Sequence, residues 1–585
     1  MYNLPPGIVY LLERAHKLLG PPALTYGLIR YFGLALPRWQ MIAALLLSLP
    51  GALTIAVWWD EVSVRLQAAR RGAVLPPRIG DVVPGGFRNL FTMIMNKDNY
   101  PVDGLEDKCI QLGSFTFNRR ILFENRIITS EPDYIKAILA TQFDDFEKGP
   151  EIRHVFNPLL GTGVFAADGE LWKFHRSMTR PFFSKDRISH FDNFDKHADI
   201  ALQKLKHRLS EGHPVDFQDL VARFTLDSAT EFLFGSDVKS LDGDLEYPHC
   251  VSGSNSGNTL ESKDPAAQFI AAFGKAQDIT SSRLRLGMHW PLMEFWKDKI
   301  KQPMKVVNDF IDPIVAQAIH SKREAERLGL LKKDQDDETL LENLVNSTED
   351  PITLRDGIMS LLVAGRDTTA STLTFAIYMF SQHPEVLKKL RQEILDKVGP
   401  HNRPTYDNFR DMKYLRAVIN ETLRLYPVVP FNVRTSKQAT VWPNPKGKPF
   451  FIPANTRSGY TVFMMHRRRD LWGPDDRFLD HRLHKYLTPH PFIFMPFNAG
   501  PRICLGQQFA YHEASFFLVR LLQSFSGITL VPDAQHPKDR VPALWAEDQK
   551  KSSKRKKIEK IRPKIHLTMY VQGGLWIKMD EAINQ

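Results

Sequence analysis

The chain contains few cysteines for its length: three among 585 residues, Cys109, Cys250 and Cys504, with no two of them close together. This scarcity excludes a disulfide framework and any C-x-x-C metal site or covalent haem attachment site. We therefore expect the protein to work in a reducing compartment, or on the reducing side of a membrane. We also expect Cys109 and Cys250 to be buried, unreactive thiols.

The sequence also lacks the basic surface with interleaved aromatic residues that a nucleic-acid-binding protein needs. The net charge is +11, but nine Lys/Arg and only one Glu fall within the single run 550–564, KKSSKRKKIEKIRPK. We therefore predict no nucleic-acid partner. The run is typical of a solvated loop, and a weak patch for anionic lipid or for a partner is the alternative.

Charge is absent from residues 39–59, WQMIAALLLSLPGALTIAVWW, which carry tryptophans at both ends. About 20 apolar residues span the hydrocarbon core of a bilayer, and tryptophan favours its interface. The stretch predicts a transmembrane helix. A buried helix of a soluble domain is the alternative, and a cleaved signal peptide is disfavoured because the apolar block is too long and starts too late. Positive charge is nearly balanced on its two sides, which leaves the orientation open.

The rest of the chain divides around this helix. Residues 1–38 form an apolar N-terminal segment that we expect to be membrane-associated, as an interfacial or re-entrant element. Residues 60–86 include VLPPRIGDVVPGG and predict a stiff, proline-rich linker. Residues 87–585 follow as one catalytic region.

Within that region the patterns predict a mainly α fold with a minor β part. Residues 113–135 alternate as short strands do before a helix, and helical periodicity dominates from 189 to 400. The stretch 352–386 predicts one long helix that breaks at His383-Pro384. Short strands and turns over 431–500 precede a last helix at 505–525.

The stretch 497–506, FNAGPRICLG, carries the chemistry of the third cysteine. Gly500 and Gly506 allow the backbone and a flat ligand to approach closely. Cys504 precedes a helix, whose positive end favours a thiolate, and a thiolate is the ligand that pushes electron density onto a haem iron. Arg502 is placed to bind a haem propionate, and Phe497 to shield the sulfur.

This pattern resembles the haem-binding loop of the cytochrome P450 family, and further family motifs follow in order. Glu421 and Arg424, in ETLR, resemble the E-x-x-R pair, which lies on one helix face. A surface ion pair would have the same spacing, so the position before Cys504 gives the motif its weight. Trp172 and Arg176, in DGELWKFHR, resemble the W-x-x-x-R contact to a propionate.

The segment 364–369, AGRDTT, resembles the oxygen-activation motif of the family's long central helix. The resemblance implies that Gly365 leaves room for dioxygen, that Thr368 acts in oxygen activation and that Asp367 delivers protons from solvent. The alternative is a small-residue helix contact in which Thr368 bonds back to its own turn. The same resemblance places two apolar groups at the substrate, although core packing explains them as well: Leu362, Val363 and Ala364, and Val429, Pro430 and Phe431.

One part departs from the family pattern. The segment 472–482, WGPDDRFLDHR, is several residues shorter than the corresponding meander of the family. That meander normally supplies another arginine to the Glu421–Arg424 pair. Arg477 is the candidate here and Arg482 the second choice. The shortening puts haem retention in doubt.

The resemblance implies a membrane-anchored haem-thiolate monooxygenase with haem b (iron protoporphyrin IX) on Cys504. The sequence of these motifs is most similar to that of membrane-bound fungal hydroxylases of alkanes and fatty acids. This similarity predicts an alkane, a fatty acid or a xenobiotic-like compound as the apolar substrate. Electrons would come from NADPH through a flavoprotein reductase, with cytochrome b5 as a second candidate donor. Membrane lipid would hold the enzyme at the endoplasmic reticulum, with its catalytic domain in the cytosol.

Two alternatives stay open at this point. A haem-thiolate isomerase or dehydratase would need no reductase, and Thr368 argues against it because such relatives commonly lack this threonine. A haem-deficient, non-catalytic relative is supported only by the shortened meander.

Overall fold

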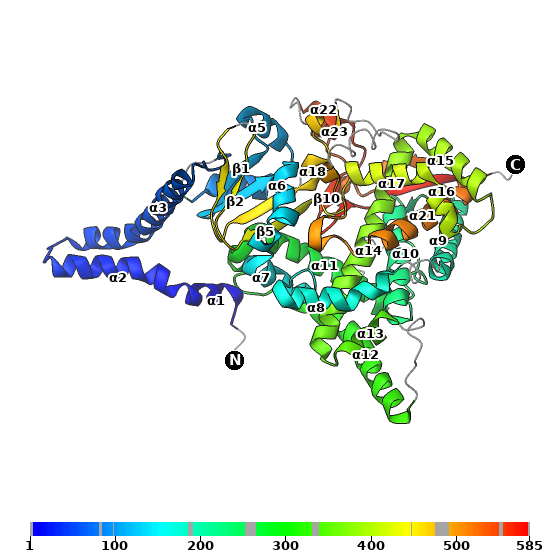
Figure 1. Cartoon of the computed structure of the whole chain (residues 1–585), viewed down its shortest axis with the longest axis horizontal. Coiled ribbons are helices and arrows are strands. Elements are labelled where there is room, and N and C mark those ends of the chain that lie inside the picture. Colours follow the sequence, from blue (N-terminus) through cyan, green and yellow to red (C-terminus); the bar gives the residue numbers. More distant parts are fainter. Residues whose placement is uncertain are drawn as a thin grey trace.

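A mainly helical domain with small β-sheets carries an N-terminal pair of helices that projects from it (Figure 1). The computed structural model describes residues 4–80, 85–96, 99–184, 191–251, 265–329, 339–445, 447–473, 491–548 and 554–582. The predicted mainly α class with a minor β part is confirmed.

The helices of the domain are of two kinds. The larger ones are α7 (Gly149–Leu160), α8 (Gly169–Thr179), α9 (Asp192–Ser210), α10 (Phe217–Phe234), α11 (Pro265–Leu286), α12 (Lys301–Leu328), α14 (Pro351–Gln382), α15 (Pro384–Lys397), α17 (Lys413–Leu425) and α21 (Gln507–Ser524). The shorter ones are α4 (Phe87–Met95), α5 (Leu105–Leu112), α6 (Pro132–Lys136), α13 (Leu340–Ser347), α16 (Tyr406–Asp411), α18 (Val462–Met465), α19 (Arg469–Trp472), α22 (Leu544–Glu547) and α23 (Lys554–Ile558).

Helix α14 is the central element of the domain. It begins where the Asp350 side chain accepts the N–H of Thr353 at 2.9 Å, and Pro351 fits its first position because no N–H is needed there. It ends before His383-Pro384, as predicted, since Pro384 cannot continue the hydrogen-bond ladder. Its apolar side chains share one buried cluster with those of α10, α17 and α21, so α14 has no solvent-facing side along much of its length.

The largest sheet has five strands in the order β1-β2-β8-β5-β3. Strands β2 and β8 are parallel, and the other neighbours are antiparallel. The strands of this sheet are β1 (Thr116–Ile121), β2 (Glu124–Thr129), β3 (Phe146–Glu147), β5 (Phe431–Ser436) and β8 (Arg457–Thr461). The smaller sheets use β4 (Val215–Asp216), β9 (Phe525–Leu530) and β12 (Trp576–Glu581), then β6 (Thr440–Trp442) with β7 (Phe450–Ile452), and β10 (Pro563–Ile565) with β11 (Met569–Val571).

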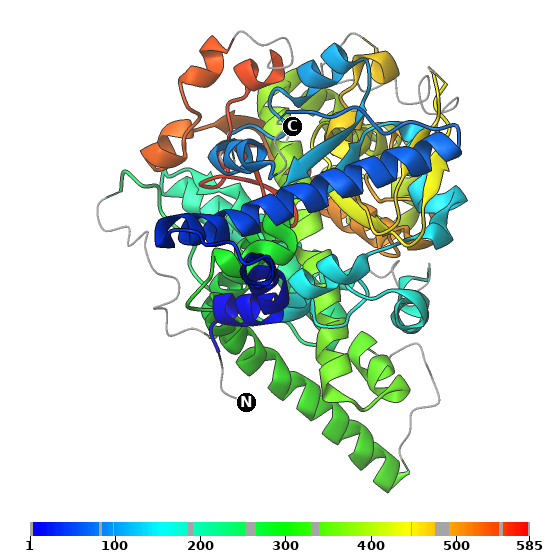
Figure 2. The ribbon, with the colours of Figure 1, turned by 90° about the vertical axis from the view of Figure 1, so that its left-hand side faces the viewer.

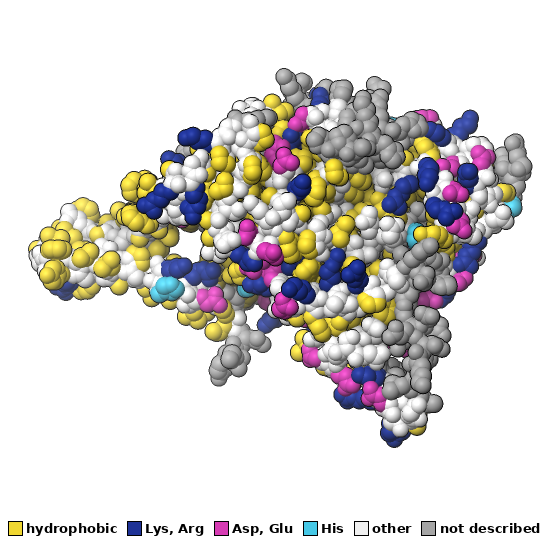
Figure 3. Space-filling model, viewed as in Figure 1, with side chains coloured by type: hydrophobic (Ala, Val, Ile, Leu, Met, Phe, Trp, Pro, Cys, Tyr) yellow, Lys and Arg dark blue, Asp and Glu magenta, His cyan; other side chains and the backbone are white. Residues whose placement is uncertain are grey.

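The N-terminal pair consists of α2 (Ala15–Tyr31) and α3 (Arg38–Arg70), which lie side by side after the short α1 (Pro6–Glu13). They extend away from the domain in Figure 1 and cross in front of it in Figure 2. Their projecting end is covered mostly by apolar side chains (Figure 3). Helix α3 is long and apolar enough to cross a membrane, and because only 6% of its apolar window is buried it is not the core helix of a soluble domain.

The described part of the predicted linker 60–86 is tied to the domain. Helix α3 continues to Arg70, and its Glu61 carboxylate binds Arg120 of β1 at 3.2 Å. Beyond the helix, Val74 pairs with Phe450 in a β-bridge. The proline-rich stretch therefore begins next to a sheet edge.

Two sequence predictions about side chains are wrong in part. Lys556, in the basic run 550–564, is buried and binds Asp103 at 2.9 Å and Asp548 at 2.8 Å, so the described part of this run is not a solvated loop. The partners come from distant segments, which the local charge count cannot show. Cys109 is buried as predicted, and burial raises the pKa of its thiol to about 12, but Cys250 is exposed.

Candidate functional site

The loop before α21 holds Cys504 by backbone hydrogen bonds. The N–H of Cys504 donates to the Phe497 carbonyl at 3.0 Å, which closes the loop around Gly500. Gly500 has φ +67°, and a Cβ there would lie 1.8 Å from the carbonyl oxygen of Leu139, so only glycine fits. Glycine is less strictly required at position 506, because a Cβ there would make an ordinary contact with the Phe183 ring at 3.4 Å.

Cys504 combines an exposed side chain with strong desolvation. Desolvation raises the pKa of its thiol, while a hydrogen bond from the Gly506 N–H and the charge of Arg176 lower it. The predicted bias of the helix end toward a thiolate is therefore outweighed in the protein alone. A cation bound to the sulfur would stabilise the thiolate.

The structure brings the predicted propionate contacts together beside this loop. The guanidinium carbon of Arg502 lies 4.5 Å from the ring centroid of Trp172, and that of Arg176 lies 5.8 Å from it. Arg176 also donates to the carbonyl of Ile503, next to Cys504, at 3.0 Å. The ring of Phe497 packs on Tyr511 at 5.0 Å, which anchors the start of the loop in the main core.

Three further residues of this cluster were not predicted: Lys148, Asp168 and Arg434. The Asp168 carboxylate accepts from Arg502 at 2.8 Å and from the Lys148 N–H at 2.8 Å. Burial, followed by the charge of Arg434, lowers the pKa of both Lys148 and Arg502, that of Arg502 to about 10. Their contact depends on packing between remote segments. The only local signal was Asp168 at the start of the quoted DGELWKFHR.

The charge of this cluster fits haem. The cations Lys148, Arg434 and Arg502 lie near the carboxylate Asp168, which also pairs with the half-exposed Arg153 at 2.9 Å, so positive charge exceeds negative charge in the cluster. Buried charge of one sign is unfavourable unless it is compensated. The two propionates of a haem supply that compensation. The exposed thiol in its glycine-containing loop would match the iron of a haem, and the surplus cations of the cluster would match its carboxylates.

The Glu421–Arg424 pair forms as predicted, on α17. Arg424 donates to the Glu421 carboxylate through two nitrogens, at 2.6 and 2.7 Å, and both side chains are fully buried. A third nitrogen of Arg424 donates to the His466 carbonyl at 2.8 Å, which ties α17 to the end of α18. Arg477 and Arg482 of the shortened meander lie outside the described residues.

His466 links this pair to the chain leading to Cys504. Its Nε2 accepts the N–H of Met495 at 2.9 Å, and its ring stacks on Phe494. Burial, reinforced by the charge of Arg424, lowers the pKa of His466 to about 3. The imidazole is therefore neutral at physiological pH and works as a hydrogen-bond acceptor.

We expect His466 to make the protein sensitive to acid. The unfolded chain binds this proton below about pH 6.5 and the folded protein only below about pH 3, so in between the free energy of unfolding falls as pH falls, by about 1.4 kcal/mol per pH unit. Urea unfolding of the wild type and of His466→Gln, which keeps an acceptor for Met495, measures this slope. The variant should lose stability less steeply between pH 6 and pH 4, and an equal slope would contradict the assignment.

Helix α14 arranges the predicted oxygen-activation segment. A Cβ on Gly365 would lie 3.3 Å from that of Ala229, so the glycine permits close contact between α14 and α10. The Thr368 hydroxyl donates to the Ala364 carbonyl at 2.6 Å. This is the hydrogen bond of Thr368 to its own helical turn that the alternative interpretation expects. It still leaves the oxygen of Thr368 able to accept a hydrogen bond.

Asp367 is nearly buried, and the two oxygens of its carboxylate differ in their hydrogen bonds. Its Oδ1 accepts from Arg366 at 2.9 Å, while Oδ2 is a buried atom without a hydrogen-bond partner among the described residues. Such an atom is costly to bury and is suited to accept a proton or a water.

A second buried acid, Glu513 of α21, lies on the other side of this segment. Its Oε1 accepts from Ser228 at 2.8 Å, and the hydroxyl of Thr369 is also close. Burial raises the pKa of Glu513 to about 8, so this carboxyl holds a proton at neutral pH. Sequence reasoning missed it, although a charged residue on an otherwise apolar helix face, HEASFF, was a visible signal.

Comparison with known proteins agrees with this site. The family model described as Cytochrome P450 matches residues 111–551. Cytochrome P450 monooxygenase pvhE of Talaromyces variabilis is 38% identical over 440 residues, which are 71% of this chain and 77% of that protein. Cytochrome P450 52A12 of Debaryomyces hansenii is 35% identical over 82% of this chain and 91% of its own length. Cytochrome P450 52A5 of Candida maltosa is 35% identical over 87% and 94%. The protein is therefore a monooxygenase of the cytochrome P450 family.

Proposed function

We propose that this cytochrome P450 is a membrane-anchored hydroxylase of alkanes or fatty acids that uses O2 and NADPH-derived electrons. The observation that carries the proposal is the arrangement around Cys504: an exposed, desolvated thiol beside a cluster in which positive charge exceeds negative charge. Cys504 would bind the haem iron, and Lys148, Arg434 and Arg502 would hold the propionates, with Trp172 and Arg176 against them. When bound, the haem supplies the iron at which dioxygen is activated, and the thiolate supplies electron density that favours O–O cleavage.

The protein's own residues would manage the protons. Thr368 would accept a hydrogen bond at the oxygen-binding side of α14, since its own hydrogen is donated to Ala364. The unpartnered Oδ2 of Asp367 would take a proton from solvent, and Glu513 would hold a second proton beside Thr369.

Replacing Thr368 is expected to separate electron consumption from product formation. In Thr368→Ala the hydroxyl oxygen is gone, and we expect product per NADPH to fall by about 10-fold, less than the roughly 100-fold effect of a direct proton donor, because Thr368 positions a proton and does not supply it. The measurement is product and NADPH oxidation in the same reaction. Thr368→Ser keeps the hydroxyl and should stay close to the wild type; equal coupling in Thr368→Ala would contradict the role.

An apolar substrate is supported by side chains that follow the E-x-x-R helix. Val429 and Phe431 are 37% and 39% exposed, although the helix before them is buried. Exposed apolar side chains of this size favour contact with an oily ligand.

The cellular setting is also a proposal. Helix α3 would anchor the enzyme in the endoplasmic reticulum membrane with the domain in the cytosol, and membrane lipid would surround α2 and α3. A flavoprotein reductase would deliver electrons from NADPH, with cytochrome b5 as a second donor. Basic residues on the Cys504 side would steer an acidic reductase, so added salt should slow reduction.

The test combines the full chain, a reductase and NADPH with hexadecane or hexadecanoic acid. Hydroxylated product that depends on NADPH supports the proposal. Turnover of a hydroperoxide without NADPH would favour the isomerase or dehydratase alternative. The absence of a red-shifted Soret band after reduction and addition of carbon monoxide would favour the haem-deficient alternative.

A further inference from the structure

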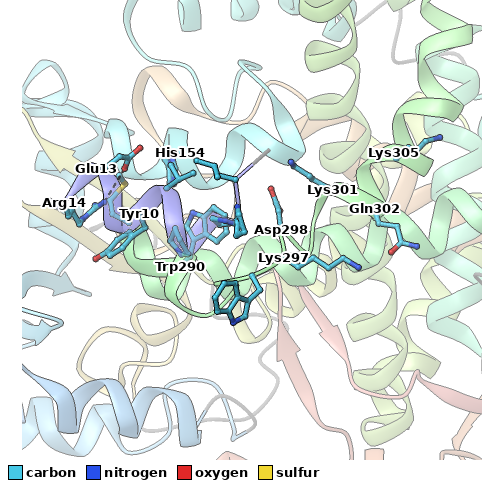
Figure 4. Close-up of a pocket in the computed structure, with 17 residues that line it drawn as sticks. Tyr10, Glu13, Arg14, His154, Trp290, Lys297, Asp298, Lys301, Gln302 and Lys305 are labelled. Atoms are coloured by element: carbon cyan, nitrogen blue, oxygen red, sulfur yellow. Dashed lines mark hydrogen bonds and ion pairs between the residues drawn. The ribbon is translucent and has the colours of Figure 1, made fainter. Parts of the chain in front are cut away.

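Helix α1 is fixed on the catalytic domain. The N–H of Gly7 donates to the Phe295 carbonyl at 2.9 Å, and a Cβ on Gly7 would lie 2.1 Å from the Phe295 ring, so a larger side chain would displace one of the two. The Tyr10 hydroxyl and Nδ1 of His289 are 2.6 Å apart in a hydrogen bond. Side chains of α1 and of the connection from α11 to α12 line one cavity (Figure 4). Residues 4–13 therefore lie on the same side of a membrane as the domain.

The last turns of α3 are held at the same domain. The Glu61 carboxylate lies 3.2 Å from Arg120 of β1 and 3.3 Å from Arg78. Between α1 and Glu61 the chain leaves the domain along α2 and returns along α3, and the two helices meet at their projecting end (Figure 1). The connection 32–37 is therefore the tip of a hairpin whose two ends are both fixed to the domain.

Helix α3 needs hydrocarbon on every side. Residues 39–59 carry no charge, whereas a helix that lies in the membrane interface needs a polar face. These 21 residues are about 32 Å long as an α-helix, close to the thickness of the hydrocarbon core. If α3 crosses the bilayer, the connection 32–37 lies on the far side. Because α1 stays with the domain, the chain must then cross a second time, within α2.

Helix α2 is too short to predict a crossing by itself, but its residues fit one that its neighbours require. Residues 18–29 carry no charge and lie between Lys17 and Arg30. The 17 residues of α2 are about 26 Å long, and long basic side chains at both ends can reach the two interfaces. The helix packs on α3, which gives its irregular stretch at Pro21 and Pro22 a protein neighbour in the bilayer.

The charge at the tip distinguishes a crossing hairpin from a re-entrant one. Arg30 and Arg38 flank the connection, next to Tyr31 and Trp39, and all four residues are exposed. A re-entrant hairpin would place both guanidinium groups in hydrocarbon. A crossing hairpin places them at the far interface, where tyrosine and tryptophan are also favoured.

A crossing hairpin also changes the balance of positive charge. With a single crossing by α3, four Lys/Arg lie on each side. With two crossings, the tip has only two, Arg30 and Arg38, and the domain side has six. These six are Arg14, Lys17, Arg65, Arg70, Arg71 and Arg78. An excess of Lys/Arg close to the membrane is typical of the cytosolic face.

We propose that α2 and α3 form a transmembrane hairpin, with α1 and the catalytic domain on the cytosolic face and the connection 32–37 on the opposite face. The bilayer is then the partner of both helices. The proposal rests on the membrane anchoring in the proposed function. It goes beyond that function in the number of crossings and in the side on which α1 lies.

The test uses the full chain as holoenzyme in sealed microsomes and a sulfonated maleimide, which does not cross a bilayer. Single cysteines are placed in a Cys250→Ser background, which removes an exposed thiol of the wild type. Leu4→Cys, before α1, and the control Lys206→Cys, on α9 of the domain, change exposed residues and should be labelled in intact vesicles. Ala35→Cys, in the connection, should be labelled only after a pore-forming toxin has opened the vesicles. All labelling is expressed relative to that in detergent-denatured protein.

Three other results would overturn the proposal. If Leu4→Cys is protected until the pores open, α3 alone crosses. If Ala35→Cys is labelled in intact vesicles, the hairpin lies on the cytosolic face. If it stays unlabelled after the pores open, the connection lies in the hydrocarbon and the hairpin is re-entrant.

Two further measurements separate this proposal from the proposed function. Extraction of the protein by sodium carbonate would contradict the anchoring itself, and with it the hairpin. Hexadecane turnover and the carbon monoxide difference spectrum are recorded for each variant. Loss of turnover with the expected labelling pattern would count against the hydroxylase function and leave the hairpin standing.

Discussion

Cys504→Ser is expected to remove the red-shifted Soret band of the reduced, carbon-monoxide-bound protein and to lower hydroxylation by about three orders of magnitude. Serine has nearly the same shape, so the Phe497–Cys504 backbone hydrogen bond and the Gly500 turn are retained. What is lost is a soft anion. A serine hydroxyl stays neutral near pH 7 and cannot donate comparable electron density to an iron. The measurement is the difference spectrum together with the product formed per enzyme.

The other two cysteines provide matched controls. Cys250→Ser changes an exposed thiol and Cys109→Ser a buried one, and neither residue contacts the Cys504 loop. Both variants should keep the red-shifted band, although Cys109→Ser should be less stable because a hydroxyl replaces a thiol inside an apolar cluster. If Cys504→Ser keeps the band, the iron has another thiolate and the site is misassigned.

The difference between Cys504 and Lys148 explains how much of the site could be predicted. Cys504, Arg502 and Gly500 lie in one loop, where local geometry fixes the spacing of glycine, cation and sulfur. Lys148 and Arg434 reach the same cluster from a helix start and from β5. The hydrogen bond from Lys148 to Asp168 and the effect of the Arg434 charge on Arg502 exist only after the domain has packed. Local pattern therefore revealed one end of the haem cluster and missed the residues that make its charge surplus.

The fold shows the same division. The ends of α14 were predictable because Pro351, His383 and Pro384 act on their own backbone. The burial of Lys556 was not, since Asp103 and Asp548 are brought to it by tertiary structure. Helix α3 continues beyond residue 59 to Arg70, and its Glu61 binds Arg120, which is likewise remote in the sequence. The predicted helix ended at residue 59 because hydropathy, the criterion used for it, falls where the apolar stretch stops.

Glu421→Ala is expected to destabilise the protein by about 3–5 kcal/mol, because it leaves the buried Arg424 guanidinium with only the His466 carbonyl among its described hydrogen-bond partners. Since His466 in turn binds the N–H of Met495, shortly before the Cys504 loop, we also expect faster loss of haem from this variant. Urea unfolding measures the first effect, and transfer of haem to an excess of apomyoglobin measures the second.

The double variant Glu421→Leu/Arg424→Met shows whether Glu421→Ala loses stability because Arg424 is left as an unpaired buried charge or because the contact between the two side chains is lost. Removing both ions takes away the uncompensated charge, so the double variant should be more stable than Glu421→Ala, although the His466 carbonyl then lacks its donor. Asp407→Ala is the matched control, because Asp407 and Arg410 have the same helical spacing at the surface, 3.4 Å apart, and it should change stability little. If Glu421→Ala behaves like this surface control, the pair does not hold α17 to the cysteine side. Haem retention would then depend on the Lys148–Arg434–Arg502 cluster alone.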